Sequence, residues 1–283
     1  MDFELSSDQQ IFYDTVRRFA SNELSEDAVR RAHDDGYPWD VAEKFSQMGL
    51  LGITIDEDKG GIGGSLTDAI LAIQAVAEFC PRSADVVQAG NFGAIRTFAE
   101  YANKDQLARY LPPLLAGKAV MSVGMSEPDA GSSVTELKTS AIADGDDFLI
   151  NGSKVFGSNT AEADVFLIYL RFGPGIDGIG SAIVERGTPG FEIGPSYRYM
   201  NGEDWAPLYF QDCRVPKENL LGPRGQGFHQ MMQTLDGGRL SIAAMGLGGA
   251  QGCFDLAIKY SNEREQFGRP IATFQIKIGR AHV

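Results

Sequence analysis

Met125-Ser126-Glu127-Pro128-Asp129-Ala130-Gly131-Ser132 brings hydroxyls, carboxylates, a rigid proline and a flexible glycine together in one short stretch. Serine and backbone N–H groups can hydrogen-bond the polar edge of a ligand, Pro128 fixes one φ angle, and Gly131 lets a ligand approach the backbone closely. A tight turn uses the same residues. The octapeptide alone therefore leaves a turn and a ligand-binding loop open, and the segments around it must decide.

The chain before the octapeptide has a helical pattern. Ser6 with Gln9 suits a helix cap, and the glycine-rich loop 56–64 separates helices, with a cap for the next helix at Ser65 or Thr67. The spacing of the loop glycines matches neither a Walker A motif nor a dinucleotide-binding fingerprint. We therefore predict a helix-rich first part in which these glycines serve loop geometry.

From about Val120 the pattern changes to short β-like runs separated by turn signals, and a β-barrel or sandwich is the natural closure. The runs are 137–143, 148–150, 153–156, 165–172, 181–185 and 208–210. Asn151-Gly152 is the strongest hairpin signal, so we predict a turn there. Residues 173–178 satisfy G-x-G-x-x-G, but another β-like run follows in place of a helix, so we predict a loop between antiparallel strands.

Helical character returns at about Gly227. Gly246, Gly248, Gly249 and Gly252 interrupt its apolar periodicity. Glycine costs about 1 kcal/mol against alanine inside a helix, so we expect these positions to lie against neighbouring helices. The chain is thus predicted to be an α+β protein in the order helical, β, helical.

Three separated segments resemble the acyl-CoA dehydrogenase family, in the order that the family has them. The octapeptide is similar to the family's flavin-and-thioester loop, and Lys154-Val155-Phe156-Gly157-Ser158-Asn159 resembles its Lys-x-Trp-Ile-Thr-Asn strand. Residues 263–271 with Phe274-Gln275 resemble the segment that reaches the FAD of a neighbouring subunit. Agreement at 110–114, 225–228 and 235–239 extends the resemblance over essentially the whole chain to Gln275.

The resemblance implies an N-terminal helical domain over 1–119, a middle β-barrel or sandwich domain over 120–226, and the first part of a C-terminal helical bundle over 227–276. It also implies FAD as cofactor and an acyl-CoA, or an acyl-carrier-protein thioester, as substrate. The implied reaction is α,β-desaturation, in which a carboxylate removes the α-proton and the β-hydrogen leaves as hydride to flavin N5. An electron-transfer flavoprotein is the implied electron acceptor.

Four residues are implied as contacts to the flavin of the same chain. Met125 and Ser126 would bond its pyrimidine side, Phe156 would pack on the ring, and Ser158 would lie near the N5 edge. Phe156 and Ser158 stand where the family commonly has Trp and Thr, so a ring and a hydroxyl are retained. Gly157 departs from the commoner Ile, which puts the local backbone path in question.

Three residues are implied as contacts to the acyl-CoA. Ser132 would meet the pantetheine arm, and Asp236 and Arg239 match family positions that contact the thioester ligand. The same Asp and Arg near a helix start could form a cap and a local ion pair, so both interpretations stay open.

Four residues near the C-terminal end are implied as contacts to a neighbour's FAD, namely Arg264, Gln266, Phe267 and Gln275. The planar guanidinium of Arg264 suits a pyrophosphate because it can donate two parallel hydrogen bonds. A solvated helix face is the alternative, since both neighbours of Arg264 are charged. If the segment serves a neighbouring subunit, the protein is a homo-oligomer.

No catalytic residue can be assigned from the sequence. The commonest family glutamate would lie beyond residue 283, and the known alternative position corresponds to Gly238. Ile278-Gly279-Arg280-Ala281-His282-Val283 matches the translation of a short-read sequencing adapter, and Lys277 agrees with it. We therefore interpret 277–283 as a non-native tail and expect the natural protein to be longer.

Composition narrows the remaining possibilities. A formal net charge of −13 without a Lys/Arg cluster argues against nucleic acid as a partner. Neither the cysteines, Cys80, Cys213 and Cys253, nor the histidines have the spacing of a metal site or a disulfide framework. The most apolar run, 69–77, is too short to span a membrane, and residues 1–4 lack a secretory signal, so we expect a cytoplasmic protein.

Other functions remain open at this stage. Flavin-dependent monooxygenases and nitroalkane oxidases share the implied fold, although the Ser-Glu-Pro-Asp-Ala-Gly-Ser loop favours a dehydrogenase. A non-catalytic acyl-CoA-binding or interaction protein is an alternative of a different class.

Overall fold

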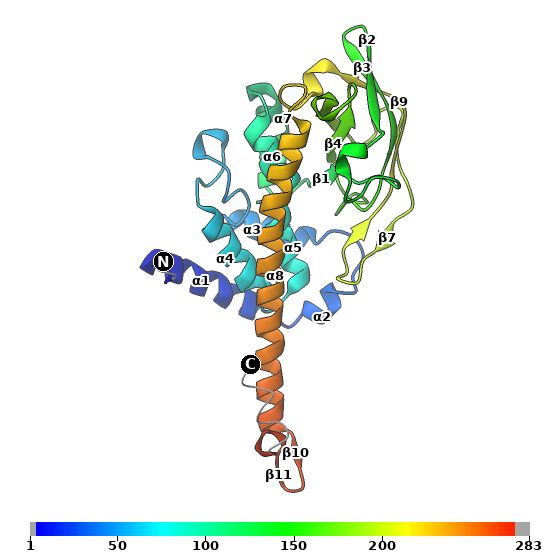
Figure 1. Ribbon diagram of the computed structural model, residues 1–283. Coiled ribbons are helices and arrows are strands. Elements are labelled where there is room, and N and C mark those ends of the chain that lie inside the picture. The colour runs from blue at the N-terminus through cyan, green and yellow to red at the C-terminus, as the bar shows by residue number, and fades with distance from the viewer. Residues whose placement is uncertain (1–3, 275–283) are drawn as a thin grey trace.

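The computed structural model describes residues 4–274, so Gln275 and the tail 277–283 lie outside the described residues. Figure 1 shows helices α1–α7 beside a curled sheet, with the long helix α8 passing along both and continuing beyond them. The predicted α+β architecture, in the order helical, β, helical, is confirmed.

The first part of the chain consists of helices. They are α1 (Ser7–Glu23), α2 (Ala28–Arg31), α3 (Trp39–Gln47), α4 (Leu66–Ala77), α5 (Pro81–Ala89), α6 (Ala94–Tyr101) and α7 (Lys104–Leu115). The predicted caps at Ser6 and Ser65 are confirmed, because each forms a capping box with the residue three positions later. Residues 69–77 lie in α4 and are mostly buried, as expected for a core helix.

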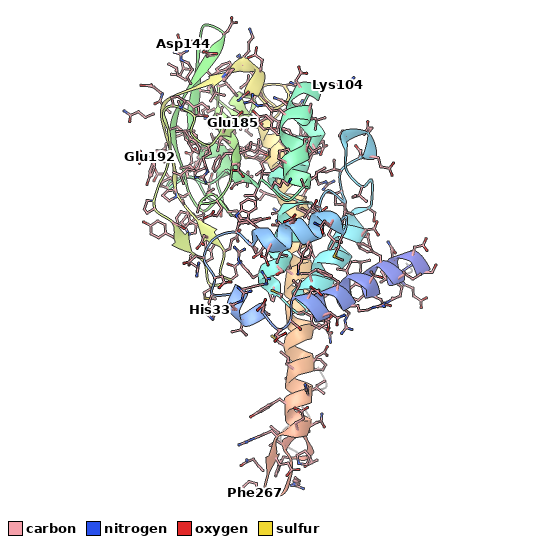
Figure 2. All side chains as sticks on the ribbon, turned by 180° about the vertical axis from the view of Figure 1, so that it is seen from behind. His33, Lys104, Asp144, Glu185, Glu192 and Phe267 are labelled. Atoms are coloured by element: carbon pink, nitrogen blue, oxygen red, sulfur yellow. The ribbon has the colours of Figure 1, made fainter. Side chains whose placement is uncertain are left out.

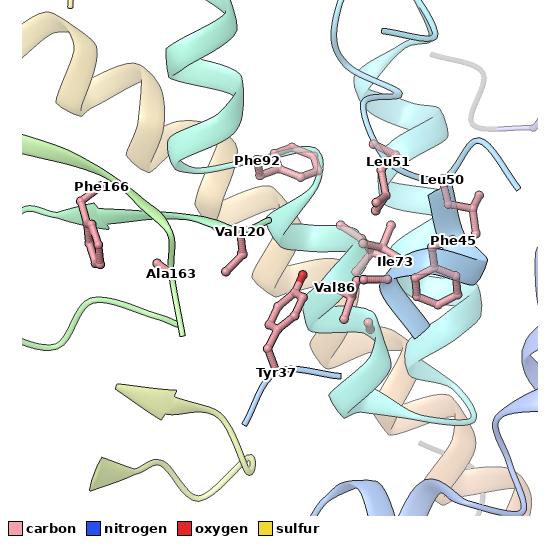
Figure 3. Close-up of a cluster of buried hydrophobic side chains, with 14 of the residues drawn as sticks. Tyr37, Phe45, Leu50, Leu51, Ile73, Val86, Phe92, Val120, Ala163 and Phe166 are labelled. Atoms are coloured by element: carbon pink, nitrogen blue, oxygen red, sulfur yellow. The ribbon is translucent and has the colours of Figure 1, made fainter. Parts of the chain in front are cut away.

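Figure 3 shows the core in which these helices meet the sheet. Phe45, Ile73 and Val86 come from α3, α4 and α5 and are fully buried, and Val120 and Phe166 continue the same cluster toward the sheet. Each such side chain contributes about 1.5–3 kcal/mol by leaving water. The helical part and the sheet therefore share one core, which fixes the cleft between them.

The middle of the chain forms a seven-stranded sheet in the order β1-β4-β2-β3-β9-β6, with β5 paired to β4. Its strands are β1 (Met121–Gly124), β2 (Ser140–Asp144), β3 (Asp147–Lys154), β4 (Val165–Arg171), β5 (Ile179–Glu185), β6 (Phe191–Ile193) and β9 (Leu208–Pro216). A separate hairpin pairs β7 (Tyr197–Arg198) with β8 (Asp204–Trp205). Short 3-10 helices, η1–η5, lie at Glu57–Lys59, Val134–Glu136, Ile176–Gly178, Lys217–Asn219 and Ile271–Thr273.

The predicted hairpin turn at Asn151-Gly152 is wrong. β3 runs unbroken through both residues, and the turn from β2 to β3 lies at Gly145, whose φ is +65°. Gly152 instead marks a register shift against β9. A Cβ there would approach the Thr139 hydroxyl within 2.5 Å, so only glycine fits this β-bulge.

The predicted loop at residues 173–178 is confirmed. It joins β4 to β5, which pair antiparallel from Arg171 and Ile179 outward, and it contains only the short turn Ile176–Gly178. The glycine pattern therefore has no dinucleotide-binding unit around it.

Helix α8 (Gly227–Glu263) has two kinds of glycine. A Cβ at Gly248 would lie 2.3 Å from the Gln74 carbonyl oxygen, and one at Gly252 would lie 2.1 Å from that of Glu78, so both glycines seat α8 on the end of α4. No atom of residues 4–274 outside the helix itself lies within 4 Å of the Cβ positions of Gly246 and Gly249. The expected packing role is therefore confirmed for the first two and wrong for the other two.

Helix α8 is also long and apolar enough to cross a membrane by length and composition, with a mean hydropathy of 1.2 over an 18-residue window. The apolar run 69–77 lies in α4 (Leu66–Ala77), which is apolar but shorter than such a span. Core helices of soluble proteins meet the same criterion, so length and composition alone do not show whether α8 lies in a membrane.

The end of the described chain lies far from the sheet. β10 (Glu265–Gln266) and β11 (Arg269–Pro270) form a small hairpin at the tip of α8. Figure 2 shows Phe267 at this tip, beyond all other parts of the molecule.

Candidate active site

A cavity of about 670 Å³ opens where the sheet faces α8. We call the loop and strand residues on one side the β wall: Val123, Met125, Ser126, Val155, Phe156, Gly157 and Ser158. We call the helical residues on the other side the α8 wall: Thr234, Leu235, Gly238, Arg239, Ile242 and Ala243. Gln88 and Gly93, from the helical part, complete the lining.

A buried ion pair holds the octapeptide in place behind the β wall. The Lys154 ammonium donates to Glu127 Oε1 at 2.8 Å and to the Met125 carbonyl at 3.2 Å. The Glu127 carboxylate also accepts from the backbone N–H groups of Lys138 and Thr139, at 2.6 and 2.9 Å. Both side chains of the pair are buried, so its contacts fix the loop that carries Met125 and Ser126.

Burial and pairing act on the two partners of this ion pair in different ways. Burial lowers the pKa of the Lys154 ammonium to about 8, although Glu127 opposes this. Burial alone would raise the pKa of Glu127, but the Lys154 charge and the hydrogen bonds from residues 138 and 139 outweigh it and lower that pKa. The carboxylate is therefore ionised at neutral pH, as a stable loop anchor requires.

The backbone after β3 leaves the strand to form the rest of the β wall. The expected strand 153–156 ends at Lys154, and Phe156 adopts φ +60°, in the left-handed region. A Cβ at Gly157 would lie 2.7 Å from the Val123 carbonyl oxygen. The isoleucine that the family commonly has here would clash with the backbone as it runs in this chain. The glycine at 157 is therefore required by the local backbone conformation.

The β wall offers hydrogen-bond donors to a ligand. Within residues 4–274, the backbone N–H groups of Phe156, Gly157 and Ser158 donate to no protein acceptor, and the Ser126 hydroxyl has no partner. The Ser158 hydroxyl lowers the pKa of the buried Glu203 carboxyl, although burial raises that pKa overall. Free donors beside an exposed aromatic ring suit a flat ligand with polar edges, which describes an isoalloxazine.

The α8 wall is apolar apart from Thr234, whose hydroxyl bonds within the protein, and Arg239. Its guanidinium pairs with Asp236 at 2.5 Å, and both side chains are mostly exposed, so the local ion pair left open by the sequence does form. Asp236 lines a smaller adjoining cavity of about 250 Å³ with Arg96 and Glu100. Among the described residues, no carboxylate lines the larger cavity, and nothing lies within 4 Å of the Cβ position of Gly238.

The other residues singled out from the sequence lie elsewhere. Ser132 is exposed on the loop and lines neither of these two cavities. Arg264, Gln266 and Phe267 lie at the exposed tip of α8, away from the cavity of their own chain (Figure 2). Gln275 is outside the described residues.

Comparison with known proteins agrees with this arrangement. Family profiles described as acyl-CoA dehydrogenase N-terminal, middle and C-terminal domains match residues 6–118, 122–213 and 225–279. The chain belongs to the acyl-CoA dehydrogenase family. Members of this family are FAD-dependent, so the chain is a flavoprotein oxidoreductase, and α8 corresponds to the beginning of the family's C-terminal domain.

Two curated relatives are similar over nearly the whole chain. The acryloyl-CoA reductase (NADH) of Anaerotignum propionicum is 37% identical over 281 residues, covering 97% of this chain and 71% of the relative. The short-chain-specific acyl-CoA dehydrogenase of Clostridium acetobutylicum is 36% identical over 279 residues, covering 97% of this chain and 74% of the relative.

Solved structures agree with the fold. A chain described with the electron transferring flavoprotein of Acidaminococcus fermentans has a TM-score of 0.91 and 36% identity, covering 99% of this chain and 75% of its own length. The FAD complex of PigA has a TM-score of 0.91 and 26% identity, with the same coverage.

Proposed function

We propose that the chain carries the flavin and thioester site of an enzyme that desaturates acyl-CoA thioesters between the α and β carbons. The observation that carries the proposal is the cavity itself. It brings Met125, Ser126, Phe156 and Ser158 from the sheet side opposite Arg239 from α8, although these segments are far apart in the sequence. FAD, when bound, supplies the two-electron redox chemistry.

The chain's own residues bind and orient in this proposal. The free hydroxyl of Ser126 and the free N–H groups at 156–158 would hold the polar edge of the flavin, and Phe156 would cover one ring face. Arg239 and Asp236 would meet the acyl-CoA from α8, and Ser132 its pantetheine arm. The apolar α8 wall keeps water from the reacting carbons, which strengthens every polar contact there.

The base that removes the α-proton is proposed to come from outside the described residues, because no carboxylate among them lines the larger cavity. We also retain Arg264, Gln266, Phe267 and Gln275 as contacts to the FAD of a second copy in a homo-oligomer. Their exposed position at the tip of α8 supports a contact outside their own chain.

The proposal also covers the substrate, the electron acceptor and the cellular location of the enzyme. Names of relatives point to short acyl-CoA thioesters and to an electron-transferring flavoprotein as redox partner. We keep the division into 1–119, 120–226 and 227–276, with 277–283 as a non-native tail. A cytoplasmic location is the proposed site of action, in line with the bacterial relatives.

FAD titration followed by anaerobic addition of butyryl-CoA tests the proposal. The purified chain is expected to bind FAD, and the thioester is expected to perturb the flavin spectrum. Gly238→Glu, which has open space for its side chain, is expected to exchange the thioester α-proton with deuterium from solvent. Gly238→Gln is the matched control and should not exchange.

Other outcomes would point to the other functions. Failure of the chain to bind FAD would contradict the proposal. Oxygen-dependent product formation with a supplied reduced flavin would favour a monooxygenase or nitroalkane oxidase. Acyl-CoA binding with no exchange in either Gly238 variant would favour a non-catalytic binding protein.

A further inference from the structure

The β7–β8 hairpin presents a stack of aromatic rings behind the β wall. Trp205 lies 5.2 Å from Tyr197 and 6.0 Å from Tyr199, both nearly parallel to it, and 4.8 Å from the ring of Phe156. We propose that Trp205 is a positioning residue, an inference that rests on the proposed FAD site. It holds the Phe156 ring as the surface on which the flavin packs.

Phe156 needs such support because its own conformation is unfavourable. Its φ of +60° is uncommon for an aromatic residue, and 61% of its surface is exposed. A strained residue keeps one conformation only when its surroundings impose it. The Tyr199 hydroxyl donates to the Phe156 carbonyl at 3.1 Å, and the Trp205 ring packs on its side chain. Backbone and ring of Phe156 are therefore both held by the same hairpin.

The hairpin is itself anchored on two sides. Arg198 donates to Asp204 across the strands at 3.2 Å and to the carbonyl of His33 at 3.0 Å, which ties the hairpin to the helical part. The Asn159 N–H donates to the Asp204 carbonyl at 3.2 Å, which ties it to the β wall. Trp205 thus sits on a fixed support, and its contact to Phe156 transmits that support to the cavity.

The stack also explains how a phenylalanine can serve where the family commonly has a tryptophan. A phenyl ring presents less area to a flavin than an indole does, and it can tilt more freely unless something blocks it. Trp205 packs on Phe156 with the ring centroids 4.8 Å apart and an interplanar angle of 47°, and so restricts the positions that the phenyl ring can take. The indole is therefore retained in the site, one layer behind the ring that faces the ligand.

Trp205→Leu in the full chain tests the inference, with Trp205→Phe as the conservative variant. The leucine variant is expected to bind FAD about tenfold more weakly, because Phe156 loses the aromatic pair that holds its ring. Its bound flavin should show altered visible absorption, and the near-UV circular dichroism without FAD should lose the signal of the stack. The phenylalanine variant should recover most of the affinity. Met200→Ala, a fully exposed position in the same hairpin, is the control and should behave as wild type.

The outcomes separate this inference from the proposed function. If wild type binds FAD and Trp205→Leu, still folded by its unfolding temperature, binds it equally with the same flavin spectrum, the inference is overturned and the FAD site stands. Equal losses in the Leu and Phe variants would also overturn it, because a ring would then be irrelevant. If wild type binds no FAD, the proposed function and the inference fall together.

Discussion

The two walls of the cavity are supported in different ways. Behind the β wall lie the buried Glu127–Lys154 pair, which holds the Met125 carbonyl, and the aromatic stack on Trp205, which packs on Phe156. Among the described residues, the α8 wall belongs to a helix that packs with one face on the helices and the sheet, where Thr234 hydrogen-bonds to Thr97 and Tyr169. Its other face carries large exposed side chains, including Leu247, Leu256 and Tyr260, and its second half extends beyond the body of the molecule (Figure 1). Both walls are therefore held by contacts within the described chain, but those of α8 lie on one face of the helix and mostly in its first half.

Of the changes proposed here, breaking the Glu127–Lys154 ion pair should reduce the stability of the protein the most. Lys154→Met leaves the Glu127 carboxylate buried without its cation, and we expect a loss of about 3–5 kcal/mol in the free energy of unfolding. The β wall should loosen with it, since Lys154 also holds the Met125 carbonyl. Urea unfolding measures the loss. The double variant Glu127→Leu/Lys154→Met should recover part of it, and equal losses in single and double variants would show that the unpaired charge is not the cause.

Two glycines three positions apart test how α8 is held. Gly252→Ala would push a Cβ to 2.1 Å from the Glu78 carbonyl oxygen, and we expect a loss of about 1–3 kcal/mol. Gly249→Ala meets open space, and its higher helix propensity should stabilise the protein by up to about 1 kcal/mol. Thermal unfolding of both variants checks the opposite signs. A gain in both would mean that α8 does not rest on α4 as described.

The stability of the protein should depend on pH through Asp85, a buried carboxyl in helix α5. Burial, and then the nearby Glu203 carboxylate, raise the pKa of Asp85 to about 7 despite its ion pair with Arg82. A carboxyl with a higher pKa in the folded protein holds its proton more firmly when folded. Stability should therefore fall as the pH rises from about 4 to about 7, by up to about 4 kcal/mol, since the pKa differs by about three units at about 1.4 kcal/mol each.

Asp85→Asn checks the origin of that slope. The amide cannot ionise, so most of the stability loss across the same pH range should disappear in urea unfolding series. An unchanged slope would assign it to other groups, of which the buried Glu203, with a pKa also raised first by burial, is the foremost.

Substitution on the bare face of α8 should have the smallest effect on folding. Leu256 is 69% exposed, so Leu256→Lys should change the free energy of unfolding by no more than about 0.5 kcal/mol. It should reduce self-association at high protein concentration, because exposed apolar area drives association. Sedimentation velocity measures this. A large loss of stability would show that the face is covered in solution.

Sequence signals predicted the structure correctly where the interactions that form it lie between residues close together in the chain. The caps at Ser6 and Ser65 depend on residues three positions away, and both are confirmed. The turn predicted at Asn151-Gly152 was wrong because a tertiary contact decides the backbone there, namely the close approach of Gly152 to Thr139, which precedes the neighbouring strand β2. The glycines of α8 divide in the same way, since only the position of α4 separates Gly248 from Gly249.

The sequence by itself determined the family, the helical–β–helical order and most segments that line the cavity, because motif chemistry and hydrophobic periodicity are properties of neighbouring residues. It did not indicate Gln88 and Gly93, which complete the lining. Only the tertiary structure decided what supports those segments. Glu127 meets Lys154 across 27 residues, and Trp205 reaches Phe156 from a hairpin that no sequence signal linked to the site. Such pairs form because folding brings distant side chains into one buried place, where a charge needs a partner and a strained ring needs a neighbour.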